Sequence, residues 1–212
     1  MVRSSENLYI GRVHDIPMGK DIPTTIVAVT GATGAAYAKR LMELLPGKTY
    51  LIITGHGKDV VDLELEGGVR SMEALATKVL KNDDLGADIS SGSGPSRRMV
   101  IVPCSMNTLS KIACGLADNL VTRAASVCLK EDWPLVIVPR ETPLSLIHLE
   151  NMTRLKRAGA VILPAAPGFY NAPRRIEDLV DFVAGKVLIA LGFEKEGAKV
   201  LRPWKGQTKK KT

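Results

Sequence analysis

The chain has 212 residues, 45% of them hydrophobic and 24% charged, which is the composition of a globular protein with one sizeable core. The net charge of +7 lies partly in the C-terminal lysines 209–211, and aromatic residues make up only 4%, a combination that disfavours nucleic-acid binding. No apolar stretch reaches the roughly 20 residues that span a bilayer, and the N-terminus lacks a signal peptide's apolar centre. We therefore expect a cytoplasmic protein without membrane contact.

Strand-like and helix-like patterns alternate along the chain. After an irregular leader at residues 1–22, a β-branched run at 25–29 predicts a strand, and a helical pattern follows from Gly34 to Leu44. Further strands are predicted at 50–53, 99–102, 135–138 and 160–163, and further helices at 71–80, 109–116, 120–129, after Ser145, and at 176–191. This alternation implies a three-layer α/β fold with a doubly wound parallel sheet. Residues 23–204 form one predicted domain, and residues 205–212 form a basic C-terminal tail.

The three cysteines, Cys104, Cys114 and Cys128, are odd in number and show no C-x-x-C spacing. This argues against a disulfide framework and against a zinc site. No histidine lies in the motif around Cys104 to activate it as a nucleophile, so we expect three reduced, mostly buried thiols. The three histidines are scattered, and no metal site is expected.

The first predicted strand ends in a tight glycine turn, Thr30 to Ala36. Its backbone N–H groups can face an anion at the start of a helix, although this signal is weak alone. A dinucleotide site would show G-x-G-x-x-G and an acidic residue about 20 positions further on, whereas the second strand ends in Thr54, Gly55 and His56. The turn therefore favours a mononucleotide phosphate over NAD.

Small polar groups follow the strand at 99–102. Ser105, Asn107 and Thr108 could cap the next helix, but they are more polar groups than one cap needs, so a ligand role is favoured.

The strand at 135–138 is followed at once by Arg140 and Glu141, a fixed cation beside a titratable acid on a strand-to-helix turn. Ligands bind at this end of open α/β sheets, so we favour a functional site over a surface loop. The last strand leads into a rigid loop that ends in Tyr170, whose hydroxyl could bind a phosphate. Arg123 and Lys130 add two cations on helices, expected near the third and fourth strand ends, and either could instead pair with a surface acid.

Several long motifs resemble one family closely. They are G-A-T-G-A-A-Y, P-C-S-M-N-T-L-S-K-I-A, G-L-A-D-N-L-V-T-R-A-A, V-P-R-E-T-P-L-S-L-I-H-L-E-N-M, G-A-V-I-L-P-A-A-P-G-F-Y and E-D-L-V-D-F-V. Together they resemble the UbiX/Pad1 family of flavin prenyltransferases over roughly residues 24–204. The resemblance implies a flavodoxin/Rossmann-like fold, a dodecamer with sites at subunit interfaces, and transfer of a dimethylallyl group from dimethylallyl phosphate to N5 and C6 of reduced FMN. The prenylated FMN would then pass to a UbiD-type decarboxylase.

The resemblance also implies functions for single residues. Glu141 would handle protons during ring closure, with Thr33 and Lys130 as further catalytic residues, and Trp204 would line the prenyl pocket. The prenyl phosphate would be held by Lys130, Arg140, Tyr170 and Lys186. FMN would be held by Gly31, Ala32, Thr33, Thr54, Ser105, Met106, Asn107, Thr108, Arg123 and Arg140.

Phosphate departure leaves charge that cations and a phenol can stabilise, so no metal is required. Two positions depart from the family pattern: Lys186 stands where Arg is frequent, and Leu85 stands where some members have tryptophan. The Leu85 position leaves open the length of the prenyl chain and whether the prenyl donor is a monophosphate or a diphosphate. Two alternatives also stay open. One is a flavoenzyme that decarboxylates a cysteine-containing substrate, for which His56 is the only positional candidate as catalytic histidine. The other is a non-enzymatic flavin carrier.

Overall fold

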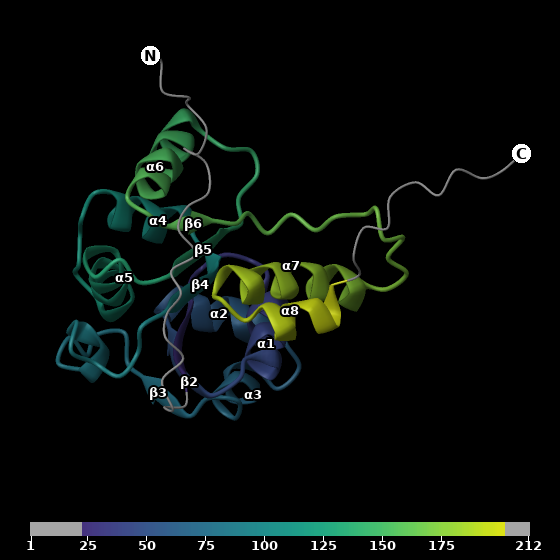
Figure 1. The fold of residues 1–212 in the computed structure, drawn as a ribbon, viewed down its shortest axis with the longest axis horizontal. Coiled ribbons are helices and arrows are strands. Elements are labelled where there is room, and N and C mark those ends of the chain that lie inside the picture. Colours follow the sequence, from purple (N-terminus) through teal and green to yellow (C-terminus); the bar gives the residue numbers. More distant parts are fainter. Residues whose placement is uncertain (1–22, 202–212) are drawn as a thin grey trace, which may run out of the picture.

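The sheet is the centre of the fold and contains six parallel strands (Figure 1). The computed structural model describes residues 23–201; the leader at 1–22, Trp204 and the tail at 205–212 lie outside the described residues. The strands are β1 (Thr24–Val29), β2 (Lys48–Ile53), β3 (Lys78–Leu80), β4 (Met99–Cys104), β5 (Leu135–Pro139) and β6 (Val161–Ile162), in the spatial order β3-β2-β1-β4-β5-β6. The predicted doubly wound parallel sheet is confirmed.

The central strands are apolar on both faces, as a parallel sheet covered by helices requires. Every residue of β1, β4 and β5 is buried. Strand β1 pairs with β2 over its whole length, from Thr24 opposite Lys48 to Val29 opposite Ile53. This register aligns the carboxyl ends of β1 and β2 at one edge of the sheet.

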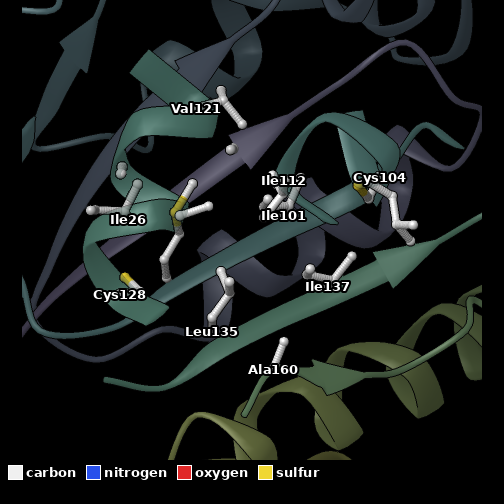
Figure 2. Close-up of a cluster of buried hydrophobic side chains, with 14 of the residues drawn as sticks. Ile26, Ile101, Cys104, Ile112, Val121, Cys128, Leu135, Ile137 and Ala160 are labelled. Carbon is white, nitrogen blue, oxygen red and sulfur yellow. The ribbon is translucent and has the colours of Figure 1, made fainter. Parts of the chain in front are cut away.

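One face of the sheet is covered by α4 (Met106–Ala113), α5 (Leu120–Lys130) and α6 (Leu146–Arg157). Figure 2 shows this core, in which Ile101 of β4 lies beside Ile112 of α4, and Cys128 of α5 lies near Leu135 of β5. The short 3₁₀ turn η1 (Asp88–Ser90) adds Ile89 to the same cluster.

The opposite face is covered by α1 (Ala35–Leu44), α2 (Gly55–Glu64), α3 (Gly68–Glu73) and α7 (Ile176–Ala190). The final helix α8 (Glu194–Val200) packs on α7 rather than on the sheet. The two helices can approach closely because Gly197 has no Cβ. A Cβ at this position would lie 2.8 Å from the carbonyl oxygen of Gly185. The three predicted layers are therefore present.

The sequence patterns were wrong in one region. Residues 71–80 were predicted to form one helix, but α3 ends at Glu73 and Lys78–Leu80 form the edge strand β3, which pairs with β2. Residues 50–52 of β2 offer this segment a hydrogen-bonding edge, and such tertiary pairing overrides local helix propensity. Helix α8 was not predicted.

Candidate functional site

The order of the strands reverses between β1 and β4, and loops from the two strands meet there. The hydroxyl of Thr30 donates to the carbonyl oxygen of Pro103 at 3.0 Å and accepts from the N–H of Ser105 at 2.7 Å. The Thr30 side chain thus joins the glycine turn to the loop after β4. In open α/β sheets, ligands bind at this kind of crossover point.

The glycine turn carries a carboxylate that the sequence did not predict. Glu64, the last residue of α2, accepts hydrogen bonds from Gly34 N–H at 2.8 Å and from Ala35 N–H at 2.8 Å. The first N–H groups of α1 are therefore already bonded to a carboxylate of the same chain. The positive end of the helix dipole stabilises this negative charge. Thr33, a predicted site residue, is exposed directly beside this contact.

The start of α2 lies against the glycine turn. Thr54 is the N-cap of α2, and its hydroxyl accepts from Gly57 N–H at 3.1 Å. A Cβ on Gly31 would lie only 2.8 Å from the Cβ of His56. The His56 side chain is 94% exposed, and its Nδ1 lies 3.3 Å from Oδ2 of Asp59. Thr54 and the turn at Gly31 therefore form one continuous surface.

A cavity of about 600 Å³ opens beside Thr54, at the carboxyl ends of β2 and β3. Its lining includes Gly55 and Lys58 of α2, Lys81 after β3, and Asn119 at the start of α5. This volume lies within the range of about 300–1,000 Å³ that is typical of small-ligand sites.

The loop after β4 both caps a helix and faces the crossover. Ser105 is the N-cap of α4: its hydroxyl accepts from Thr108 N–H at 3.3 Å and donates to the Thr108 hydroxyl oxygen at 3.1 Å. The capping alternative, which the sequence disfavoured, is thus observed for these two residues. Met106 is buried in the core, whereas Asn107 is exposed. Asn107 is therefore the side chain of this loop that the cap leaves exposed.

Arg140 and Glu141 follow β5 at the same edge of the sheet. The N–H of Arg140 donates to the carbonyl oxygen of Cys104 at 3.3 Å, so this turn adjoins the loop after β4. The Nε of Arg140 is buried and has no hydrogen-bond partner among residues 23–201. A buried, unpaired guanidinium N–H is costly unless an anion or a carbonyl group binds it. Glu141 is exposed, and its Oε1 accepts from Thr142 N–H at 3.0 Å.

Tyr170 and Lys186 meet at one aromatic ring. The rings of Tyr170 and Phe182 pack edge to face with centroids 5.9 Å apart, and Lys186 Nζ lies 5.8 Å from the centroid of Phe182. Two of the predicted phosphate-binding side chains therefore contact the same aromatic ring. Tyr170 belongs to the loop after β6, and Lys186 belongs to α7. Lys130, another predicted phosphate ligand, belongs to the distant helix α5.

Lys130 lies at the other edge of the sheet. The turn after α5 meets the start of β4, where Met99 N–H donates to the carbonyl oxygen of Pro134 at 2.9 Å. Helix α5 therefore runs against the strand direction and carries Lys130, its last residue, away from Ser105. Six residues of β4 at about 3.3 Å each separate the two edges by roughly 17 Å. Lys130 pairs with Glu131.

Arg123, one helical turn into α5, donates from Nε to the carbonyl oxygen of Ser90 at 3.0 Å. One copy of the chain thus gathers the glycine turn, Thr54, the Ser105 loop and Arg140 at the carboxyl edge. It does not bring Lys130 to them, and the expectation that Lys130 lies near the strand ends of its own chain was wrong.

The thiols fit the structural interpretation in two of three cases. Cys104 and Cys128 are buried, and burial raises the pKa of both, that of Cys128 to about 12. Cys114 is exposed, contrary to expectation, because it is the C-cap of α4 rather than a core position. Among residues 23–201, no group of three or more His, Cys, Asp or Glu side chains could hold a metal ion. None of the helices within that range is both long and apolar enough to cross a membrane.

A doubly wound sheet whose carboxyl edge carries a glycine turn, a hydroxyl-rich loop and an unpaired arginine N–H defines a nucleotide-binding α/β protein. A family model described as Flavoprotein matches residues 18–188. Flavin prenyltransferase UbiX of Methanothermobacter thermautotrophicus is 48% identical over 191 residues, which cover 89% of this chain and 98% of that protein. The chain therefore belongs to the UbiX family of flavin prenyltransferases.

Solved structures agree with this assignment. AnUbiX (PadA1), in complex with FMN and dimethylallyl pyrophosphate, superposes with a TM-score of 0.85 at 38% identity, covering 88% of this chain and 100% of that chain. A dodecameric FMN-dependent UbiX-like decarboxylase from Escherichia coli O157:H7 superposes with a TM-score of 0.82 at 43% identity, covering 86% and 100% of the two chains. The fold and the family predicted from the sequence are both confirmed.

Proposed function

We propose that this protein is a flavin prenyltransferase that joins the dimethylallyl group of a dimethylallyl phosphate ester to reduced FMN. The observation that carries the proposal is the cluster at the carboxyl edge, where Arg140 keeps a buried Nε without a partner among residues 23–201, beside the Ser105 loop. The high identity to named flavin prenyltransferases over nearly their full length supports the reaction class. The product would pass to a UbiD-type decarboxylase.

FMN fits the residues gathered at this edge. The Arg140 Nε–H is a buried donor that a flavin carbonyl or a phosphate oxygen would satisfy. At the same edge of the sheet, the exposed Thr33 and Asn107 and the Thr54 N-cap offer further polar groups, and Gly31 lets the glycine turn lie close to α2. Reduced FMN supplies the nucleophilic N5 and C6 atoms. In our proposal, Gly31 to Thr33, Thr54, Ser105 to Thr108, Arg123 and Arg140 hold it.

The prenyl phosphate would be bound by Tyr170 and Lys186 together with Arg140. The flexible ammonium group of Lys186 can stabilise the negative charge that grows on the phosphate oxygens during bond cleavage. The Tyr170 hydroxyl can add a directional hydrogen-bond donor. Lys130 is the fourth proposed ligand. Because it lies at the opposite edge of its own sheet, a second copy of the chain would have to supply it, which supports an oligomer such as the dodecamer of the E. coli relative.

Glu141 is the proposed proton-transfer group. Its carboxylate is exposed beside Arg140 and accepts the N–H of Thr142 through one oxygen, so it keeps lone pairs for a reacting proton. Thr33 lies next to the Glu64 contact and would orient the flavin edge at the glycine turn.

The cysteine-decarboxylating alternative finds little support. Its candidate histidine, His56, has a 94% exposed side chain that faces Asp59. A flavin carrier would need the FMN loops but not Glu141, Tyr170 and Lys186, so substitutions at these residues separate a carrier from an enzyme.

The decisive experiment is anaerobic incubation of the protein with reduced FMN and dimethylallyl monophosphate or diphosphate, followed by mass spectrometry of the released flavin. We expect a mass gain of one five-carbon prenyl unit, and comparison of the two donors identifies the preferred phosphate form. Release of unmodified flavin with both donors, from protein that binds FMN, would refute the proposed function.

Variants assign the individual functions. Glu141→Gln should bind FMN normally and slow conversion by about 10²- to 10⁴-fold, the usual contribution of a general acid or base. Thr142→Ala is the matched control, because it keeps the backbone N–H that Glu141 accepts. Lys186→Ala should raise the KM for the prenyl phosphate without loss of FMN. Full single-turnover activity of Glu141→Gln would leave that carboxylate with a structural function only.

A further inference from the structure

The turn between β5 and α6, which carries Arg140 and Glu141, is tied to the rest of the molecule at its two ends. At its start, Arg140 N–H donates to the carbonyl oxygen of Cys104 at 3.3 Å. Residues 141–144 are exposed, and within residues 23–201 no hydrogen bond joins them to another element. The contact between Thr142 N–H and Oε1 of Glu141 is local. The group that holds the far end of the turn therefore determines where Glu141 lies.

The capping box of α6 holds that far end. Ser145 is the N-cap, and its Oγ accepts from His148 N–H at 3.2 Å. In return, Ser145 N–H donates to Nδ1 of His148 at 3.3 Å. Glu or Gln usually occupies this third helical position, because its side-chain oxygen accepts the N–H of the N-cap residue. The imidazole can replace that oxygen only while Nδ1 carries no proton, so the neutral ring holds its proton on Nε2.

The capping imidazole also lies near the loop after β4. Helices α4 and α6 run side by side, with Asn151 Nδ2 donating to Ser110 Oγ at 3.0 Å. Three residues further along both helices, Arg154 Nη1 donates to the carbonyl oxygen of Ala113 at 3.3 Å. The same spacing one turn earlier brings the third residue of α6 opposite Asn107, in the loop proposed to hold FMN. The capping residue is therefore placed between this loop and the turn after β5.

We propose that His148 is a positioning residue for prenyl transfer, which in its neutral form fixes the turn that presents Glu141 and on protonation releases it. This inference rests on the function proposed above and adds a residue to its proton-transfer step. In a protonated ring, Nδ1–H and Ser145 N–H are two donors that face each other. The ring then also places a positive charge at the positive end of the α6 dipole. Both effects open the cap, and histidine titrates between about pH 5 and 8.

The elements packed around the cap carry charges of both signs. They are Arg140 and Glu141 in the turn, Glu150 and Arg154 on α6, and Lys111 on α4, which pairs with Asp118. Strand β6 adds none, since it consists of Val161 and Ile162. Because Glu141 is itself an acid, a test by pH has to compare variants that all retain it.

The first test measures kcat, KM and FMN affinity of the full chain with reduced FMN and dimethylallyl monophosphate or diphosphate. His148→Ala should lower kcat by about 2- to 30-fold, the effect of losing one helix cap, with FMN affinity unchanged. His148→Gln should restore kcat, because Gln completes a capping box. Thr153→Ala is the matched control, since it removes a hydrogen bond to the Leu149 carbonyl oxygen on the same helix and leaves the cap intact.

Two results of this test would overturn the proposal. One is a wild-type kcat in His148→Ala whose folding is verified by circular dichroism. The other is a His148→Gln variant as slow as His148→Ala, which would mean that acceptance of the Ser145 N–H is not what the imidazole contributes.

The second test varies the pH and needs no destabilised variant. The ratio of the wild-type rate to the His148→Gln rate should fall as the pH is lowered from about 8 to 5, because the wild type alone loses its cap. Both proteins retain Glu141, so its own titration cancels in the ratio. A ratio that stays constant over this range would contradict the assigned function of the imidazole.

Hydrogen exchange separates the cap from catalysis. Mass spectrometry of the peptide that covers residues 141–149, without a prenyl donor, should show faster exchange in His148→Ala than in His148→Gln by about 2- to 30-fold. The wild type should resemble His148→Gln at about pH 8 and His148→Ala at about pH 5. Equal protection in all three proteins would overturn the proposal. An inactive wild-type protein with this pH-dependent protection would instead refute the proposed function and leave the pH-sensitive turn standing.

Discussion

Substitution of Gly31 by alanine tests whether the glycine turn and the start of α2 touch as closely as the structure indicates. The Cβ that this substitution adds would meet the Cβ of His56 at 2.8 Å, whereas ordinary van der Waals contacts begin at 3.4 Å. Both atoms are attached directly to the backbone, so no change of rotamer relieves the contact and the chain itself has to move. Overpacking of this kind typically costs about 1–3 kcal/mol. We expect the Gly31→Ala variant to lose that much free energy of unfolding.

The double-mutant cycle with His56→Gly identifies the cause. Removal of the second Cβ should relieve the clash, while the new glycine in α2 costs about 0.5–1 kcal/mol on its own. The double variant should therefore be more stable than the sum of the two single losses predicts, by about 1–2 kcal/mol. Gly55→Ala is the control, because a Cβ there meets nothing within 4 Å and should be neutral or stabilising.

Urea unfolding at fixed protein concentration and calorimetry of FMN binding are the two assays. Because Gly31 borders the proposed flavin site, Gly31→Ala should also weaken FMN binding, and His56→Gly should restore part of it. Equal stability of Gly31→Ala and wild type, or a cycle without coupling, would refute the close contact between the turn and α2.

Three further predictions concern other parts of the molecule. Burial and, to a smaller extent, the charge of Glu64 raise the pKa of Tyr37, so Glu64→Gln should lower that pKa and should destabilise α1 by about 0.3–1 kcal/mol. Phenolate absorbance measures the titration, with Tyr37→Phe as the control, and an unchanged pKa would place the carboxylate elsewhere. At pH 8 an alkylating agent should modify Cys114 but neither Cys104 nor Cys128 in the native protein, and all three after denaturation; mass spectrometry of native protein with a modified Cys128 would contradict the burial described. Gly197→Ala should cost about 1–3 kcal/mol in urea unfolding, because its Cβ would meet the Gly185 carbonyl oxygen at 2.8 Å; a loss no larger than for Gly55→Ala would mean that α8 packs less closely on α7.

The parts of the fold that the sequence predicted are those with a strong local pattern. The apolar run at β5 and the long apolar pattern of α7 are recognisable from the sequence alone as a buried strand and a helix. The alternation of strands and helices then predicts a parallel sheet. Strand β3 was missed because three residues carry no period, and it exists only through its pairing with Ile52 and its neighbours in β2. Edge strands of this length are decided by tertiary contacts.

The candidate site divides in the same way. The residues at the carboxyl ends of β1, β4 and β5 could be predicted because parallel strands bring their ends to one edge. Glu64 could not, since its contact with Gly34 spans 30 residues and no local pattern marks a carboxylate that will reach a helix start. The position of Lys130 was misjudged because a helix that returns across the sheet carries its last residue to the far edge, and sequence proximity to a strand does not tell which end is near.

The buried hydroxyl of Thr30 has a consequence for the thermodynamics of binding. It is both donor and acceptor, to Pro103 and from Ser105, so two loops that belong to different βα units are coupled into one rigid body before any ligand arrives. A flavin that touches both loops would not have to order them, and the entropy lost on binding would be confined to the ligand and a few exposed side chains. Thr30→Val removes both hydroxyl hydrogen bonds at nearly constant volume and keeps the bond from Thr30 N–H to the Pro103 carbonyl oxygen at 3.2 Å, so it would loosen that preorganised surface and raise the entropy lost on binding.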